Sequence, residues 1–105
     1  MANPQERILI VESDPIISDV IGRQALQSAG YQVIIVNDAT AAISRALQFS
    51  PDVIITNMNL PGLSGKDLLV ALTSQNVETP VIVMASKGAE ADIMQAFRLG
   101  ASDYL

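Results

Sequence analysis

Residues 51–65 read PDVIITNMNLPGLSG, and this stretch carries the first indication of the fold. Its β-branched run, Val53–Asn57, is apolar until its last two residues. Such a run is typical of a strand that is buried on both faces of a parallel sheet. Pro61 and Gly62 in the segment that follows indicate a reversal of the chain. The stretch therefore predicts a strand followed by a polar loop.

The same stretch also predicts a helix and a site. Ser64 is a suitable N-cap, and the spacing of the leucines that follow it predicts a helix over about Lys66–Ser74. In open α/β sheets, ligands and reacting groups gather at the carboxyl ends of the strands. We therefore expect Asn57 to lie at the centre of any site in this protein.

The rest of the chain alternates short apolar runs with amphipathic segments. The other expected strands are Arg7–Val11, Tyr31–Val36, Pro80–Met84 and a last one within Ala101–Leu105. The other expected helices run from the N-cap Asp14 to about Ala29, over Ala39–Phe49 with Asn37 or Asp38 as its cap, and over about Glu90–Leu99. The first of these helices is expected to bury Ile17, Val20, Ile21 and Leu26. Strands that alternate with helices of this length predict an α/β fold with right-handed crossovers and a parallel sheet.

Composition and charge exclude several classes of function. The chain has 105 residues, of which 50% are hydrophobic, enough for one domain with a real core. A net charge of −5 argues against direct binding to nucleic acid or to an anionic membrane. Cysteine and histidine are absent from the sequence, so thiolate and imidazole chemistry are excluded. Because no apolar run approaches the roughly 20 residues of a membrane span, we expect a cytoplasmic domain.

The expected helices are one fewer than the expected strands. A doubly wound sheet needs cover on both faces, so a chain that stops within its fifth strand should leave apolar surface bare. We expect either that more chain follows in the native protein or that a partner covers this face. A homodimer is one form that such a partner could take.

Four motifs carry a resemblance that spans the whole chain. They are RILIVESDP at 7–15, PDVIITNMNLPGLSG at 51–65, PVIVMAS at 80–86 and GASDYL at 100–105. In this order and spacing they resemble the receiver domain of bacterial two-component response regulators. The resemblance implies a flavodoxin-like (βα)5 sheet of order 2-1-3-4-5, here one receiver-like domain over residues 1–105, truncated within strand five and lacking the last helix. For typical members it also implies an aspartate that accepts a phosphoryl group from a histidine kinase with Mg²⁺.

At the ends of the first and third strands, the resemblance assigns altered side chains to the functional positions. The phosphoacceptor position is Asn57, and the positions of the acidic pair are Glu12 and Ser13. A carboxamide is a poor nucleophile and cannot form an acyl phosphate. Mg²⁺ prefers hard, anionic oxygens, and Glu12 is the one carboxylate left at these three positions. We therefore expect no metal site, with Glu12 as the remaining candidate ligand and a strand-end polar residue as its simpler interpretation.

The fourth and fifth strands also differ from the family pattern. The position of the switch Ser/Thr is Ala85, which has no hydroxyl to bind a phosphoryl oxygen, and Ser86 follows where a small residue is usual. The aromatic switch position is Tyr104. Because the coupling through residue 85 is lost, we interpret Tyr104 as statically packed or as a fixed contact. The family's lysine would lie two residues beyond Leu105.

The loop after the third strand completes the expected site with three residues, Asn59, Pro61 and Gly62. Asn57 itself has two interpretations, natural degeneration of the site or an engineered substitution that blocks phosphorylation. The further changes at Ser13 and Ala85 favour natural degeneration, because a block needs one substitution.

We therefore expect a regulatory module that is not an enzyme, needs no cofactor and acts by protein–protein interaction without aspartyl phosphorylation. Its expected contact surface is the last helix and the last strand, or a dimer interface. Its expected partner is a histidine kinase or an output domain, which could belong to the same native chain. One alternative is a conventional phospho-receiver whose acceptor is blocked by Asn57. Another is a small nucleotide- or flavin-binding protein, although a phosphate loop after the first strand and aromatic residues to enclose a flavin are missing.

Overall fold

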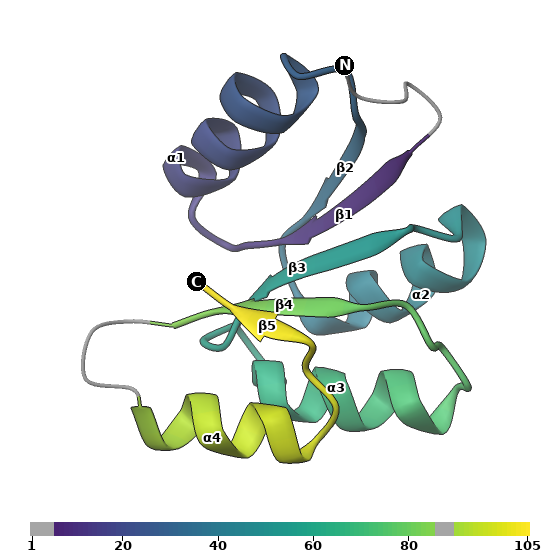
Figure 1. Ribbon diagram of the computed structural model, residues 1–105, viewed down its shortest axis with the longest axis vertical. Helices are drawn as coiled ribbons and strands as arrows, with labels where there is room; N and C mark the ends of the chain where they lie inside the picture. Colours follow the sequence, from purple (N-terminus) through teal and green to yellow (C-terminus); the bar gives the residue numbers. More distant parts are fainter. Residues whose placement is uncertain (1–5, 86–89) are drawn as a thin grey trace.

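A parallel sheet forms the centre of the molecule, with the strands in the order β2-β1-β3-β4-β5 (Figure 1). The computed structural model describes residues 6–85 and 90–105, and the following elements belong to this part of the chain. The strands are β1 (Arg7–Val11), β2 (Gln32–Val36), β3 (Val53–Asn57), β4 (Val81–Met84) and β5 (Asp103–Tyr104). The helices are α1 (Pro15–Ser18) with its π-helical continuation η1 (Asp19–Gln27), α2 (Ala39–Phe49), α3 (Gly65–Ser74) and α4 (Glu90–Arg98). The predicted α/β fold and its strand order 2-1-3-4-5 are confirmed.

Three helices begin at the caps that the sequence indicates. The Asp14 Oδ1 atom accepts from the backbone N–H of Ile16, and Pro15 occupies the first position of α1. Asp38 caps α2 in the same way. Ser64 and Asp67 form a reciprocal capping box at the start of α3. These local hydrogen bonds explain why the starts of the helices could be predicted closely.

The first helix differs from the prediction. A single α-helix to about Ala29 was expected, but the chain continues from α1 as the π-helix η1. Gly22 in η1 lies against the sheet, and a Cβ atom there would come within 2.8 Å of the Ile35 Cδ1 atom. Because the packing of this glycine against β2 is a tertiary contact, it could not be predicted from the spacing of apolar residues along the chain.

The predicted burial of this helix is also partly wrong. Ile17 and Val20 were expected to be buried, but they are 39% and 48% exposed. Ile21 and Leu26 are half-buried and pack against the sheet. Among the described residues, α1 and η1 (together labelled α1 in Figure 1) form the one helical segment on their side of the sheet. The flank that carries Ile17 and Val20 therefore has no neighbouring helix in the part of the chain that the structure describes.

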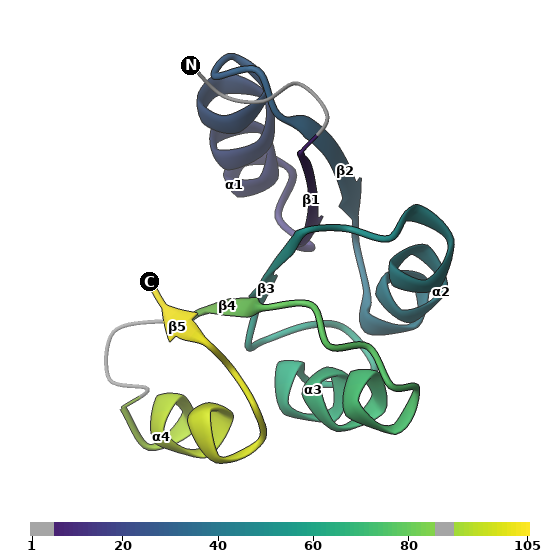
Figure 2. The ribbon, with the colours of Figure 1, turned by 45° about the vertical axis from the view of Figure 1, so that its right-hand side comes forward.

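The two faces of the sheet carry separate hydrophobic cores. Figure 2 shows α2, α3 and α4 on one side of the sheet and α1 on the other. The first, here called the three-helix face, lies against α2, α3 and α4, and its buried side chains include Leu9, Val11, Ile54, Leu68, Leu72 and Val83. The second, here called the single-helix face, lies against α1 and η1, and its buried side chains are Ile8, Ile10 and Ile55. Alternation of side chains along each strand assigns neighbouring residues to opposite faces.

The remaining predicted boundaries shift by one or two residues, as expected where helix and strand ends fray. β2 begins at Gln32 instead of Tyr31, and β4 begins at Val81 instead of Pro80. α3 begins at Gly65, α4 ends at Arg98, and β5 is limited to Asp103–Tyr104. In the parts of the chain that the structure describes, none of the helices has the length and apolar character required to span a membrane.

Candidate functional site at the carboxyl ends of the strands

The structure brings Glu12 and Asn57 together at the carboxyl edge of the sheet. β1 and β3 are parallel neighbours, with Val11 paired to Thr56, so the next residue on each strand reaches the same point. The Asn57 Nδ2 atom donates a hydrogen bond of 2.8 Å to the Glu12 Oε1 atom. Glu12 is only 2% exposed, so this carboxylate is held inside the protein. A buried carboxylate next to a carboxamide therefore forms the core of the site.

Backbone groups complete the hydrogen bonding of both side chains. The N–H of Asp14 donates to Glu12 Oε2 at 3.0 Å, and the N–H of Asn59 donates to Asn57 Oδ1 at 2.9 Å. Because the Asn57 oxygen faces a backbone donor, its NH₂ group must face the carboxylate. Within the described residues, every buried side-chain nitrogen and oxygen has a hydrogen-bond partner. Neutral donors thus satisfy the Glu12 carboxylate.

Ser13, at the second position of the acidic pair, and its neighbour Asp14 do not join the Glu12–Asn57 contact through their side chains. Ser13 is exposed. Asp14 uses its Oδ1 atom to cap α1, through the backbone N–H of Ile16 at 2.9 Å. Among the described residues, no three acidic, histidine or cysteine side chains lie together in a group that could hold a metal ion.

The loop from β3 to α3 is tied down at its two ends. At the first end, Asn57 accepts from the Asn59 N–H, as described above. At the second end, the Gly65 N–H donates to the Met58 carbonyl at 2.8 Å, and a Cβ atom on Gly65 would come within 2.7 Å of the Met58 Cα atom. Sequence reasoning did not predict the contact between Gly65 and the buried Met58, although a glycine directly after the N-cap is a signal for close backbone approach.

The three predicted loop residues lie on the outside of this loop. Asn59, Pro61 and Gly62 are all exposed. Gly62 has a φ of 77°, in the left-handed region that favours glycine. Asn59 contributes its backbone N–H to the site.

Ala85 lies beside the Glu12–Asn57 pair, whereas Tyr104 lies elsewhere. Ala85 lines a hollow of about 250 Å³ together with Glu12, Asn57, Ile17 and Met84. Tyr104 is paired with Val83, a residue of the three-helix face, and its ring meets the ring of Phe97 edge to face at 5.9 Å. The position of Ser86 lies outside the described residues.

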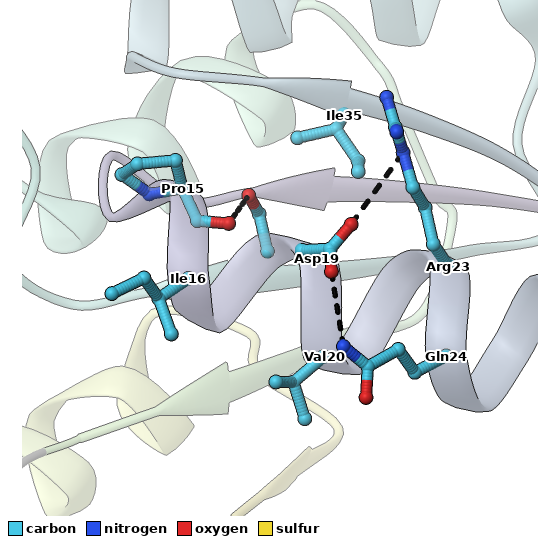
Figure 3. Close-up of a pocket in the computed structure, with 8 residues that line it drawn as sticks. Pro15, Ile16, Asp19, Val20, Arg23, Gln24 and Ile35 are labelled. Carbon is cyan, nitrogen blue, oxygen red and sulfur yellow. Dashed lines mark hydrogen bonds and ion pairs between the residues drawn. The ribbon is translucent and has the colours of Figure 1, made fainter.

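A larger hollow of about 530 Å³ runs along α1 and η1 and reaches Ile35 of β2 (Figure 3). Its polar side chains already have partners within α1 and η1. The Asp19 carboxylate contacts the Arg23 Nε atom at 3.7 Å and accepts from the Gln24 Nε2 atom at 3.0 Å. The Ser18 hydroxyl donates to the Pro15 carbonyl at 3.2 Å. These pairs are local to the helix, and we assign no function to this hollow.

Comparison with known proteins identifies the class. The family model of the response regulator receiver domain matches residues 8–105. Because this match covers nearly the whole chain, the protein belongs to the response regulator receiver domain family. Receiver domains are signalling modules that interact with histidine kinases and with output domains.

Curated relatives extend this comparison to longer proteins. The chain is 35% identical over 98 residues to the transcriptional regulatory protein KdpE of Mycobacterium tuberculosis (strain CDC 1551 / Oshkosh), which covers 93% of this chain and 42% of KdpE. It is 33% identical over 102 residues to the transcriptional activator protein PfeR of Pseudomonas aeruginosa, which covers 97% of this chain and 33% of PfeR. The chain therefore spans less than half the length of these relatives.

Solved structures agree with the family. The receiver domain of the Francisella response regulator 1452 matches with a TM-score of 0.87 at 26% identity, over 96% of this chain and 83% of that chain. The phosphorylated cyanobacterial phytochrome response regulator RcpA matches with a TM-score of 0.84 at 25% identity, over 96% of this chain and 79% of that chain. Both matches support the receiver fold described above.

Proposed function

We propose that this receiver domain is a regulatory module that acts by protein–protein interaction, without aspartyl phosphorylation. The observation that carries the proposal is the neutral Asn57 side chain at the end of β3, which donates to Glu12. A carboxamide cannot attack phosphorus to form an acyl phosphate. Ala85 adds to this, because it offers no hydroxyl to a phosphoryl oxygen beside residue 57. The output of the domain would then depend on its fixed surface and not on a phosphorylation cycle.

The donor set does not fit the Mg²⁺ ion that typical receivers use. Mg²⁺ demands near-octahedral oxygen ligands, preferably anionic. Both Glu12 oxygens accept N–H donors, Asp14 caps α1, and Ser13 is neutral. The proposed function therefore includes no cofactor, no enzymatic step and no step that passes through a metal ion.

The surface formed by α4 and β5 is the proposed contact surface. Met94, Phe97, Tyr104 and Leu105 expose large apolar areas there. The edge-to-face contact with Phe97 holds the Tyr104 ring, which supports a fixed contact instead of a moving switch. A histidine kinase, an output domain on the same or another chain, or a second copy of this domain would bind there, in the cytoplasm.

A second candidate function is a phospho-receiver that is blocked at a single position. The observation that favours it is the retained placement of residue 57, which ends β3 beside the buried Glu12 carboxylate. In that case an aspartate at this position would restore the acceptor.

Intact-mass analysis after incubation with acetyl phosphate and MgCl₂ tests both candidates. The protein as it exists is compared with Asn57→Asp, and Asn76→Asp serves as the matched control because it adds the same charge at an exposed position outside the site. We expect no phosphoryl adduct on any of the three. An adduct on Asn57→Asp alone supports the blocked phospho-receiver, and an adduct on the unchanged protein overturns the proposed function.

A further inference from the structure

The contact between Glu12 and Asn57 joins two loops as well as two strands. Glu12 is linked onward to the backbone of Asp14, at the start of α1, through its Oε2 atom. Asn57 is linked onward to the backbone of Asn59, in the loop before α3, through its Oδ1 atom. Three hydrogen bonds of 2.8 to 3.0 Å therefore run from one loop to the other through these two side chains.

The chemistry of this chain of hydrogen bonds depends on an amide at position 57. A buried carboxylate is costly unless donors or a cation compensate its charge. The Asn57 side chain supplies a donor on its NH₂ group and an acceptor on its oxygen, and it uses both. An ionised aspartate offers acceptors alone, so it would meet the Glu12 carboxylate with a second negative charge at hydrogen-bond distance.

The loop between β3 and α3 has little freedom to compensate for a lost contact at Asn57. Met58 is buried, and its N–H donates to the Met84 carbonyl at 2.9 Å. Gly65 packs against the Met58 backbone at the other end of the loop. The Asn57 side chain therefore acts on a segment whose neighbouring backbone is already held in place.

We propose that Glu12 and Asn57 form a metal-independent latch that holds the β1–α1 and β3–α3 loops in one arrangement. This inference deepens the proposed function, and the role of the latch in signalling rests on that function. The latch keeps the carboxyl edge of the sheet in a single state without a cation or a phosphoryl group. Asn57 is a positioning residue, because it acts through Glu12 and through the loop backbone.

The sharpest test of the latch swaps the carboxylate at position 12 with the carboxamide at position 57. Four proteins are compared in EDTA: the unchanged protein, Asn57→Asp, Asn76→Asp as the charge control at an exposed position outside the latch, and the double variant Glu12→Gln/Asn57→Asp, which reverses the amide and the carboxylate. We expect Asn57→Asp to lower the melting temperature by about 10 °C, Asn76→Asp to change it by less than about 3 °C, and the double variant to recover at least half of the loss. Melting of the unchanged protein should not respond to MgCl₂, whereas Asn57→Asp should be stabilised by it.

Hydrogen exchange gives a local readout of the same latch. The backbone amides of Asp14 and Asn59 should exchange at least about tenfold faster in Asn57→Asp than in the unchanged protein, and the double variant should restore their protection. A general loss of stability would accelerate amides throughout the domain, whereas loss of the latch accelerates these two beyond the rest.

The outcomes separate this inference from the proposed function. Equal melting temperatures and equal exchange for the unchanged protein and Asn57→Asp in EDTA would overturn the latch and leave the absence of phosphorylation untouched. Stabilisation of the unchanged protein by MgCl₂ would also overturn it. A phosphoryl adduct on the unchanged protein would overturn the proposed function, while the melting and exchange data would still decide on the latch.

Discussion

The two faces of the sheet are built from similar strands but differ in how they are covered. On the three-helix face, α2, α3 and α4 bury Leu68, Leu72 and Val83 almost completely. On the single-helix face, α1 and η1 lie over Ile8, Ile10 and Ile55, while Ile82 and Met84 on β4 are half-buried. Neighbouring residues of one strand, which face opposite sides of the sheet, therefore contribute different amounts to the free energy of unfolding. The difference teaches that burial here depends on whether a helix lies over the strand, because Ile10 is fully buried beneath η1 whereas Ile82 and Met84 on the same face are only half-buried.

The largest effect is expected from a truncation in the three-helix face. Leu68→Ala removes a side chain that is 0% exposed and leaves a cavity between α3 and the sheet. We expect the free energy of unfolding to fall by about 3 kcal/mol. Urea denaturation followed by circular dichroism measures this loss. A loss under about 1 kcal/mol would mean that this face is much less tightly packed than the structure indicates.

A pair of glycine substitutions compares the rigidity of the two faces. Gly65→Ala places a methyl group against the Met58 backbone, which cannot move aside easily, so we expect a loss of about 2 kcal/mol. Gly22→Ala meets the end of the flexible Ile35 side chain, so we expect a loss of under about 1 kcal/mol. Melting curves of the two variants measured side by side decide the order. If Gly22→Ala proved the more damaging, the single-helix face would be the stiffer one.

A truncation on the single-helix face should lower the free energy of unfolding by less than Leu68→Ala does on the three-helix face. Ile82→Ala removes a half-buried side chain, so only part of its apolar area returns to water. We expect a loss of about 1 kcal/mol, in contrast to about 3 kcal/mol for Leu68→Ala. The same urea titration measures both. An equal loss for the two variants would contradict the difference in cover between the faces, and the test is sharper if both proteins are first shown to be monomeric.

The smallest effect is expected on the outer side of α1. Ile16 is 74% exposed, so Ile16→Ser should change the free energy of unfolding by no more than about 0.5 kcal/mol. If this side of α1 is open to solvent, the melting temperatures of Ile16→Ser and of the unchanged protein should both be independent of protein concentration. A marked destabilisation that grows with concentration would reveal an interface at Ile16.

Much of the fold could be predicted because local signals agreed with one another. Asp38 and Ser64 mark helix starts by hydrogen bonds within a few residues, so α2 begins at Ala39 as expected and α3 begins one residue before the expected Lys66. β3 was predicted with the correct bounds from its β-branched residues, Val53–Asn57. The strand order came from the resemblance to a family and is confirmed by the pairing of β1 with both β2 and β3.

Other features could not be read from local patterns. Ile17 and Val20 have the spacing of core residues, but their exposure depends on what lies beside α1 in space. The π-helical turn at η1 includes Gly22, whose close approach to Ile35 joins residues from two different elements. The contact between Gly65 and Met58 was not predicted for a similar reason, because it exists only once the loop has closed.

The sequence by itself determined the kinds of side chain at the carboxyl edge of the sheet. It showed a carboxamide at 57, a carboxylate at 12 and a methyl group at 85, and these alone limit the chemistry that is available. Only the tertiary structure decided how they are used. Parallel pairing of β1 with β3 brings Glu12 within 2.8 Å of Asn57 across 45 residues of chain, because strands that are distant in sequence end at the same edge. That contact turns two strand-end residues into one hydrogen-bonded unit.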